Sequence, residues 1–332
     1  MRPLRRNSDE PVALVPLHFE KYLTISQCVE TFVATLRTVA RGENRYYYLV
    51  QTYRWDGAVR RKERYLGTEL PSHLDLQRRS LVREVWRETW FRLFQSIHDG
   101  YHAHLRTLPG PGIEKEREQF IVEFTYDTNR IEGSTLTFQE TVDLLEHGIS
   151  PRAKPMRDIR EAELHAALMR SLLTRPEPVD LPHLLAWHKA VFAETKPEYA
   201  GRTRDFEVRI QRSKHVPPPP LELRPMLLEL LRWAKRRAKE LDPVERAAEF
   251  HFRFENIHPF GDGNGRIGRI AMNMLLHEYG YPMLNIQYGK RAGYYHALER
   301  SSVISDPLPF MLWFFRRYLR DGKRWARAAG SD

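Results

Sequence analysis

The feature that most restricts the fold of this chain is a glycine-rich loop at residues 258–269, which reads His-Pro-Phe-Gly-Asp-Gly-Asn-Gly-Arg-Ile-Gly-Arg. Glycine stands at three alternate positions, Gly261, Gly263 and Gly265. Because glycine has no Cβ, such a run can turn in ways closed to other residues, and its successive N–H groups can form a concave anion site. A helix that begins at about Gly265 would add its free N–H groups and its dipole at the same place. The loop therefore predicts a phosphate-binding turn at the start of a helix.

The charged side chains of the loop fit the same ligand. Arg266 and Arg269 are three residues apart, so both can point from one face of a helix, and the arginine fork binds two phosphate oxygens at once. Asp262 is a hard oxygen ligand suited to Mg²⁺, which usually joins one or two carboxylates to substrate phosphates. His258 is the group whose proton affinity suits a base near neutral pH. Together they predict a site for a nucleoside triphosphate, Mg²⁺ and a proton acceptor.

A dinucleotide-binding fingerprint overlaps this loop, because residues 263–268 formally match G-x-G-x-x-G. That motif requires a strand before it and a helix after it. The preceding segment instead begins with the helix-start signals Asp242 and Pro243 and continues with apolar residues at helical spacing. Phe250, Phe252 and Phe254 also alternate as in a strand, but we favour a helix. A Walker-type loop is excluded because no Gly-Lys-Ser/Thr follows.

The loop resembles the signature of the Fic family, H-x-F-x-(D/E)-G-N-G-R-x-x-R. Every fixed position is met, by His258, Phe260, Asp262, Gly263, Asn264, Gly265, Arg266 and Arg269. The resemblance implies a helical core and transfer of AMP from ATP to a hydroxyl side chain of a target protein. The related Doc branch, which behaves as a kinase, carries lysine at the position of Gly265. The glycine here therefore favours nucleotidyl transfer.

The resemblance also implies a role for each residue of the loop. Asp262 would hold Mg²⁺ on the phosphates of ATP. Gly263, Asn264 and Gly265 would hold phosphate oxygens, with Arg266 at the β-phosphate and Arg269 at the γ-phosphate. His258 would take the proton from a Ser, Thr or Tyr hydroxyl that attacks the α-phosphorus, and Phe260 would be buried as the anchor of the loop. The expected activity is that of a protein adenylyltransferase.

A second motif precedes the loop at residues 128–133, Thr-Asn-Arg-Ile-Glu-Gly. It resembles the inhibitory pattern (S/T)-x-x-x-E-(G/N) of the same family, matched by Thr128, Glu132 and Gly133. There the glutamate pairs with the second loop arginine, here Arg269, which cannot bind a carboxylate and a γ-phosphate at once. The alternative is an ordinary helix end, with Glu132 exposed and Gly133 as a left-handed cap.

Two further segments resemble parts of the family site. Alternating Phe206, Val208 and Ile210 predict a short strand. In Fic proteins the corresponding hairpin flap aligns the target by strand addition, which would make Val208, Arg209 and Ile210 the docking residues. The alternative is a connecting segment without a docking role, which continues into a polyproline II stretch at the prolines of residues 217–220. Tyr295 lies in a stretch that resembles the lining of the adenine pocket, although core packing explains an aromatic there equally well.

The predicted fold is mainly α: a helical Fic-type core with a small β-hairpin flap, preceded by an α+β region containing one β-hairpin. Residues 1–108 form the N-terminal region, in which residues 45–66 read as two strands around Asp56-Gly57 and residues 74–105 as one amphipathic helix. Residues 109–322 form the Fic domain with its N-terminal inhibitory helix, and residues 323–332 a tail. The stretch Leu108–Gly112 is the best linker candidate.

Composition limits the remaining possibilities. The chain has 332 residues and a formal net charge of +10, and no apolar run reaches membrane-spanning length. Cys28 is the sole cysteine, which excludes an intrachain disulfide. No apolar signal core follows the charged start, so a cytoplasmic location is the default expectation and no membrane partner is expected. The expected partners are ATP and a protein target, with a homo-oligomer as an open possibility.

Two other functions stay open at this level. The same site can run in reverse and remove AMP from a modified protein, with Glu132 aligning the attacking water. Alternatively, the basic chain is a nucleic-acid-binding regulator in which the Fic domain is a passenger, although no nucleic-acid-binding motif supports this.

Overall fold

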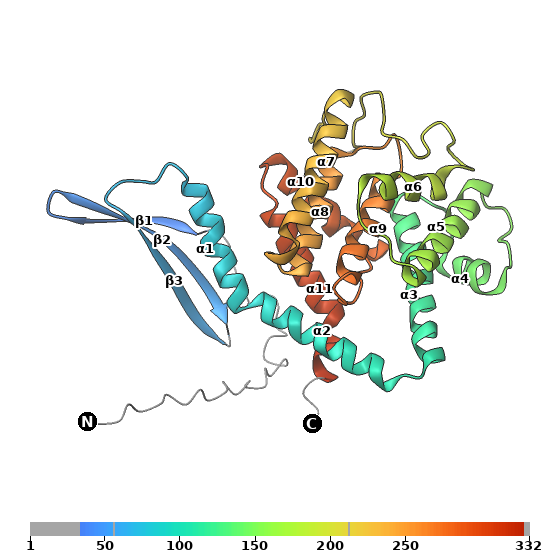
Figure 1. Cartoon of the computed structure of the whole chain (residues 1–332), viewed down its shortest axis with the longest axis horizontal. Helices are drawn as coiled ribbons and strands as arrows, with labels where there is room; N and C mark the ends of the chain where they lie inside the picture. Colours follow the sequence, from blue (N-terminus) through green and yellow to red (C-terminus); the bar gives the residue numbers. More distant parts are fainter. Residues whose placement is uncertain (1–33, 56, 212, 329–332) are drawn as a thin grey trace, which may run out of the picture. The chain divides into compact units, whose positions relative to one another are not determined.

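The computed structural model describes residues 34–55, 57–211 and 213–328 (Figure 1). Cys28 and the last four residues of the predicted tail lie outside these ranges. The chain divides into two compact units, one that includes the described residues before Trp90 and one that spans Trp90–Trp325. The larger unit therefore begins before the boundary at residue 108 that we predicted for the Fic domain, and that boundary stays a prediction.

The first unit contains a three-stranded antiparallel sheet in the order β1-β2-β3, formed by Thr35–Arg41, Asn44–Trp55 and Ala58–Gly67. The predicted hairpin is confirmed as β2–β3, with Gly57 at a positive φ of 73° in the turn. Strand β1 was not predicted. Helix α1, Leu74–Glu88, lies along one face of the sheet (Figure 1), where the Tyr53 hydroxyl donates to Glu88 at 3.2 Å.

The prediction of a single helix over residues 74–105 is wrong, because the first helix ends at Thr89. This residue leaves the helical region at φ −125° and ψ −87° and ends α1. Its hydroxyl donates to the Val85 carbonyl at 2.7 Å, a local bond with which threonine competes with the helix backbone. Helix α2 then runs from Trp90 to Thr107 and belongs to the larger unit.

The second unit is helical in its described residues. Its further helices are α3 Gly110–Ile131, α4 Phe138–His147, α5 Met156–Thr174, α6 Leu181–Phe192, α7 Pro220–Arg236, α8 Pro243–Ile257, α9 Asn264–His277, α10 Arg291–Val303 and α11 Leu308–Ala328. Local sequence explains where several begin. Thr137 and Glu140 form the capping box of α4, and the Asp180 and Asp242 carboxylates cap α6 and α8.

Helices α8 and α9 pack against each other in the core of this unit, and the glycine-rich loop joins them (Figure 1). Phe250, Phe254 and Phe260 are fully buried, and burial of such a side chain contributes about 1.5–3 kcal/mol. Because α8 precedes the loop, the dinucleotide-binding alternative is excluded, since it requires a strand there. The mainly helical fold that we predicted is confirmed.

The predicted flap does not form a paired hairpin. No strand is assigned between residues 200 and 217 among the residues described there. Arg204 binds the backbone at both ends of the segment, at the Phe206 carbonyl (2.8 Å) and the Pro218 carbonyl (2.6 Å). The alternating apolar residues at Phe206, Val208 and Ile210 therefore do not form the predicted strand.

No helix in the described part of the chain combines the length and the apolar character that crossing a membrane requires.

Candidate active site

The loop between α8 and α9 is held by buried contacts around Phe260. The Phe260 ring stacks on His188 of α6, with ring centroids 4.0 Å apart. The Asn264 amide binds the Phe260 backbone twice, accepting from its N–H and donating to its carbonyl, each at 2.8 Å. The Asn264 side chain, which we expected to bind phosphate, therefore has its amide engaged within the protein, and its backbone N–H is the group left for an anion.

Backbone conformation explains a glycine in this loop. Gly263 has a positive φ of 80° and directly precedes α9, and a Cβ there would overlap the Phe192 ring. His258, at the other end of the loop, is the C-cap of α8 and also takes a left-handed conformation, with φ 49°. The two left-handed residues bracket a tight turn that delivers the chain to the start of α9.

His258 has the geometry of a proton acceptor. Its Nδ1 lies 3.3 Å from the backbone carbonyl of Glu255, and because a carbonyl can only accept, Nδ1 carries the proton. The lone pair is then on Nε2. Burial lowers the pKa of His258 to about 4, so the ring is neutral at pH 7. A neutral imidazole with a fixed tautomer can take a proton from an incoming hydroxyl.

Arg204, which the sequence analysis did not single out, holds this histidine in place. Its Nε donates to the His258 carbonyl and its backbone N–H donates to the Pro259 carbonyl, both at 2.9 Å. The side chain is buried although it lies in an extended segment. Nothing in a local pattern of arginines identifies which one turns inward, because the His258 and Pro259 carbonyls that this arginine binds are more than fifty residues away.

The motif at the end of α3 meets the loop. Nη2 of Arg269 lies 2.7 Å from Oε1 of Glu132, and its Nε donates to the Thr128 hydroxyl at 2.7 Å. Arg269 is 1% exposed. Burial lowers the pKa of Arg269, but the Glu132 carboxylate outweighs this and the net direction is upward. The expected pairing of Glu132 with Arg269 is thus present in the structure.

The Glu132 carboxylate also reaches the start of α9. A Cβ on Gly265 would overlap one of its oxygens, so the carboxylate lies against the helix N-terminus where we predicted a phosphate. Gly133 follows with φ 96° and Glu132 is the C-cap of α3. The helix therefore ends here with Gly133 in a left-handed conformation, as the alternative expected, but Glu132 pairs with Arg269 instead of being free. The inhibitory role of this pair stays a prediction.

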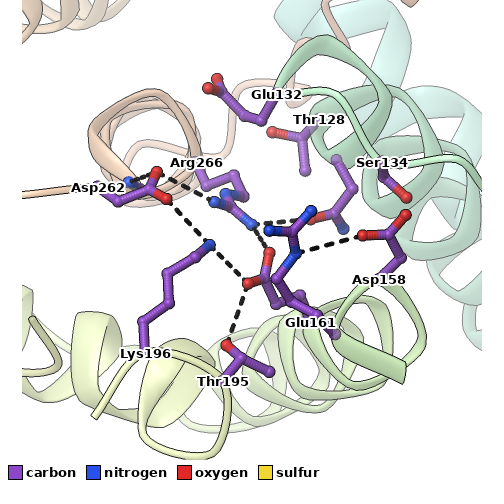
Figure 2. Close-up of polar contacts among 12 residues, drawn as sticks. Thr128, Glu132, Ser134, Asp158, Glu161, Thr195, Lys196, Asp262 and Arg266 are labelled. Atoms are coloured by element: carbon purple, nitrogen blue, oxygen red, sulfur yellow. Dashed lines mark hydrogen bonds and ion pairs between the residues drawn. The ribbon is translucent and has the colours of Figure 1, made fainter. Parts of the chain in front are cut away.

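A second carboxylate cluster surrounds the other loop arginine (Figure 2). Glu161 of α5 pairs with Nη1 of Arg266, and Lys196 lies 2.6 Å from Glu161 and 3.0 Å from Asp262. Nη2 of Arg266 lies 3.5 Å from Asp262. Glu161 and Lys196 were not predicted as site residues. Their place depends on how α5 and the turn after α6 pack beside the loop, and no local signal marks it.

Asp262 fits the divalent cation that the loop implies. Burial alone would raise the pKa of its carboxyl, but Arg266 and Lys196 outweigh this and lower it, so the group is ionised at neutral pH. Its side chain is 42% exposed. No cluster of three or more His, Cys, Asp or Glu able to hold a metal occurs among the described residues. The site therefore fits a cation that takes its remaining ligands from water and substrate phosphates, as Mg²⁺ does.

The remaining predicted residues lie around this centre. Tyr295 is 46% exposed and its hydroxyl donates to the Ile131 carbonyl, one residue before Glu132, at 3.2 Å. Its neighbour Tyr294 is buried and bonds His251, so this stretch supplies one core ring and one ring at the site. Arg209 is exposed and its neighbours Val208 and Ile210 are half-buried.

Comparison with known proteins gives one family. Residues 178–276 match the model of the Fic/DOC family. The protein adenylyltransferase fic-1 of Caenorhabditis elegans is 28% identical over 226 residues, which cover 66% of this chain and 44% of that protein. The protein adenylyltransferase Fic of Nematostella vectensis is 29% identical over 219 residues, covering 64% and 51% respectively. The chain thus spans about half the length of the curated relatives it matches.

Solved structures agree with this match. A fragment of Fic-1 from C. elegans superposes with a TM-score of 0.62 at 26% identity, covering 77% of this chain and 75% of the fragment. A Fic-domain signalling protein from Bacteroides thetaiotaomicron gives a TM-score of 0.63 at 25% identity, covering 72% and 97%. The loop between α8 and α9 lies inside residues 178–276, the part of the chain that matches the Fic/DOC family.

Proposed function

We propose that this chain is a protein adenylyltransferase, which transfers AMP from ATP to a Ser, Thr or Tyr hydroxyl of a target protein. The observation that carries the proposal is the position of His258, a neutral imidazole with an available Nε2, in the same loop as an anion site at the start of α9. The relatives named as protein adenylyltransferases support the same reaction class.

The triphosphate would lie along the loop. The backbone N–H groups of Asn264 and Gly265 would face its oxygens at the helix N-terminus, where the dipole favours negative charge. The Gly263 N–H, which we also expected to bind phosphate, donates instead to Oδ1 of Asp262 at 2.5 Å. Arg266 would meet the β-phosphate and Arg269 the γ-phosphate. Asp262 would hold Mg²⁺, which when bound neutralises phosphate charge.

The reaction then needs positioning and one proton transfer. His258 Nε2 takes the proton as the hydroxyl oxygen attacks the α-phosphorus in line, and pyrophosphate leaves. Most of the acceleration in such a transfer comes from orientation and charge stabilisation rather than from covalent help by the protein. Arg204 serves this step indirectly, because it fixes the backbone on which His258 stands.

The target would be aligned by the extended segment at Val208, Arg209 and Ile210. Its backbone lies outside any sheet, and the Ile210 carbonyl already accepts from the Ser213 N–H at 3.1 Å. The other N–H and C=O groups of the segment would pair with an extended target segment. Tyr295 would lie against the nucleotide beside the end of α3. Two binding surfaces would thus meet at the loop.

Glu132 would inhibit the chain in its resting state. Its carboxylate binds Arg269 and occupies the start of α9, which are the two places proposed for the γ-phosphate. Nucleotide binding in the productive pose would require this carboxylate to leave.

Substitution of His258 tests the proposal. His258→Ala should abolish transfer of AMP to protein, because no other group takes the proton, while nucleotide affinity changes little. Incorporation of label from ATP measures the transfer, and calorimetry measures the affinity. The exposed His147, at the end of α4, provides a matched control, since His147→Ala should leave both readouts unchanged. Transfer that survives in His258→Ala would contradict the assigned role, and release of AMP from an AMP-modified protein by the unsubstituted chain would favour the reverse reaction.

A further inference from the structure

Lys196 is fixed between two carboxylates beside the loop (Figure 2). Its Nζ lies 2.6 Å from Oε1 of Glu161 and 3.0 Å from Oδ2 of Asp262. The side chain is 12% exposed, and its backbone N–H donates to the Phe192 carbonyl at the end of α6 at 2.8 Å. The ammonium is therefore held in a defined place instead of being solvated like an ordinary surface lysine.

The cluster is balanced in charge but uneven in access to solvent. Two acids, Glu161 and Asp262, face two bases, Lys196 and Arg266. Glu161 and Arg266 are nearly buried, with side chains 7% and 4% exposed, whereas Asp262 is 42% exposed. Nη2 of Arg266 approaches Asp262 only to 3.5 Å, which is long for a hydrogen bond. Of the two cations, Lys196 is thus the nearer to the Asp262 carboxylate, which is the acid of the cluster that is exposed to a ligand.

An ammonium and a divalent cation are rivals for such an oxygen. Mg²⁺ binds carboxylate oxygen at about 2.0–2.1 Å and holds its ligands in a strict octahedron. An ammonium bonded to Oδ2 of Asp262 takes the lone-pair direction that the metal needs, and its like charge opposes the metal at short range. Both cannot rest on this oxygen at full strength.

We propose that Lys196 competes with a divalent cation for the Asp262 carboxylate, so that the metal binds only when the ammonium has turned fully to Glu161. The inference rests on the role proposed above for Asp262. Glu161 is the second place for the lysine: its carboxylate already accepts from Lys196 and also from the Thr195 hydroxyl at 3.0 Å. The buried acid keeps the displaced ammonium neutralised, which makes the exchange possible without expelling a charge into the core.

Manganese binding tests this directly. We would use the full chain carrying Glu132→Gly, with α,β-methylene ATP as a nucleotide that the site does not cleave, and measure free Mn²⁺ by electron paramagnetic resonance. Lys196→Met keeps the length of the side chain and removes its charge, and should tighten Mn²⁺ binding by about tenfold, the range expected for the loss of one close competing charge. Lys189→Met makes the same change at an exposed lysine of α6 and should leave Mn²⁺ binding unaltered.

Each possible result for Lys196→Met either supports or overturns the inference. Unchanged Mn²⁺ affinity in Lys196→Met overturns the inference, and so does weaker binding, which would mean that the ammonium holds the nucleotide instead. A lower melting temperature with no change in Mn²⁺ affinity would show a purely structural role and overturns it as well.

The parent reaction is tested separately by Asp262→Asn. If this change does not weaken Mn²⁺ binding, the proposed metal role of Asp262 is wrong and the inference falls with it. If Asp262→Asn weakens binding while Lys196→Met has no effect, the inference alone fails.

Glu161→Gln adds a check on the second place of the lysine. It should weaken Mn²⁺ binding when Lys196 is present, because the ammonium then has Asp262 as its remaining carboxylate. In the Lys196→Met background the same change should have little effect on Mn²⁺. An equal effect in both backgrounds would show that Glu161 acts through Arg266, and would overturn this part of the proposal.

Discussion

Several histidines of this chain are buried and neutral, and their chemistry differs from that of histidines in solution. His165, His188 and His251 have no exposed surface, and burial lowers the pKa of these rings to about 3, 4 and 3 respectively. None belongs to a metal site among the described residues. His188 supports the loop, since it stacks on Phe260 and bonds the Asp262 carbonyl at 2.9 Å.

These shifts predict that stability depends on pH. In the unfolded chain each ring takes a proton near pH 6.5, whereas in the folded protein it stays neutral down to about pH 4. The free energy of unfolding should therefore fall as pH drops from about 6.5 towards 4, by up to about 1.4 kcal/mol per pH unit for each such histidine. Urea denaturation at pH 7 and pH 5 measures this.

His165→Gln should lose one histidine's share of that dependence, because unfolding would then expose one fewer imidazole that takes up a proton. His147→Gln, at an exposed position, should keep the full dependence. Burial raises the pKa of Asp242 to about 7 and that of Glu255 to about 8, and these two acids act in the opposite direction, so the comparison between variants decides the matter. If His165→Gln and His147→Gln show the same change in urea midpoint between pH 7 and pH 5, the His165 ring is not kept neutral in the way described.

At this scale the sequence predicted the loop residues but not the partners that hold them. His258, Asp262 and Arg269 were found because their roles lie in a contiguous pattern. The sequence did not identify Arg204, Glu161 or Lys196. Each of them acts through contacts with residues on other elements, at separations such as 54 positions for Arg204 and 105 for Glu161, and a local pattern does not record such contacts. Asn264 has its amide bound to the Phe260 backbone, which a motif that records residue types does not reveal.

At the scale of elements, the end of α3 and the start of α9 form the contact that would regulate the site. The ion pair of Glu132 with Arg269 joins the two helices, and Thr128 adds a hydrogen bond from one turn earlier in α3. Because an arginine that binds a carboxylate is not available to a phosphate, the position of α3 would set the affinity for nucleotide.

Removal of that carboxylate should release the site. Glu132→Gly should raise the affinity for ATP and increase modification of the chain by itself, by roughly the tenfold to hundredfold expected for the loss of a charged contact of about 1.5–3 kcal/mol. Calorimetry with ATP and labelling of the purified chain measure the two effects. Unchanged affinity and labelling would dismiss the inhibitory role, and Glu123→Gly, in the same helix, serves as a control for helix damage.

Helices were predicted well where capping residues and apolar spacing mark them in the sequence. Strands were predicted poorly where their existence depends on pairing with another strand. The helix-start signals Asp242 and Pro243 and the apolar spacing after them gave α8. Strand β1 was missed because its sequence, Thr35–Arg41, has few apolar residues and is defined by its register with β2. The strand predicted at Phe206–Ile210 failed for the complementary reason, since alternation alone does not supply a partner strand.

The whole molecule joins a larger helical unit, which contains the region similar to the Fic/DOC family, to a smaller unit of sheet and helix. The charge of +10 is spread over both, and the strands of the smaller unit carry several arginines, including Arg37, Arg54 and Arg61. Binding of nucleic acid and self-association remain predictions from composition. The proposed activity depends on the loop and its neighbours, all of which lie within Trp90–Trp325.

The central claim, that the loop delivers AMP rather than phosphate to a protein, is tested most directly by the position of the label in ATP. The full chain carrying Glu132→Gly would be incubated with ATP labelled at the α-phosphate or at the γ-phosphate, and protein-bound label would be counted. We expect stable incorporation from the α-label alone, and we expect it to be lost when His258→Ala is added. Incorporation from the γ-label, or from neither, would contradict it.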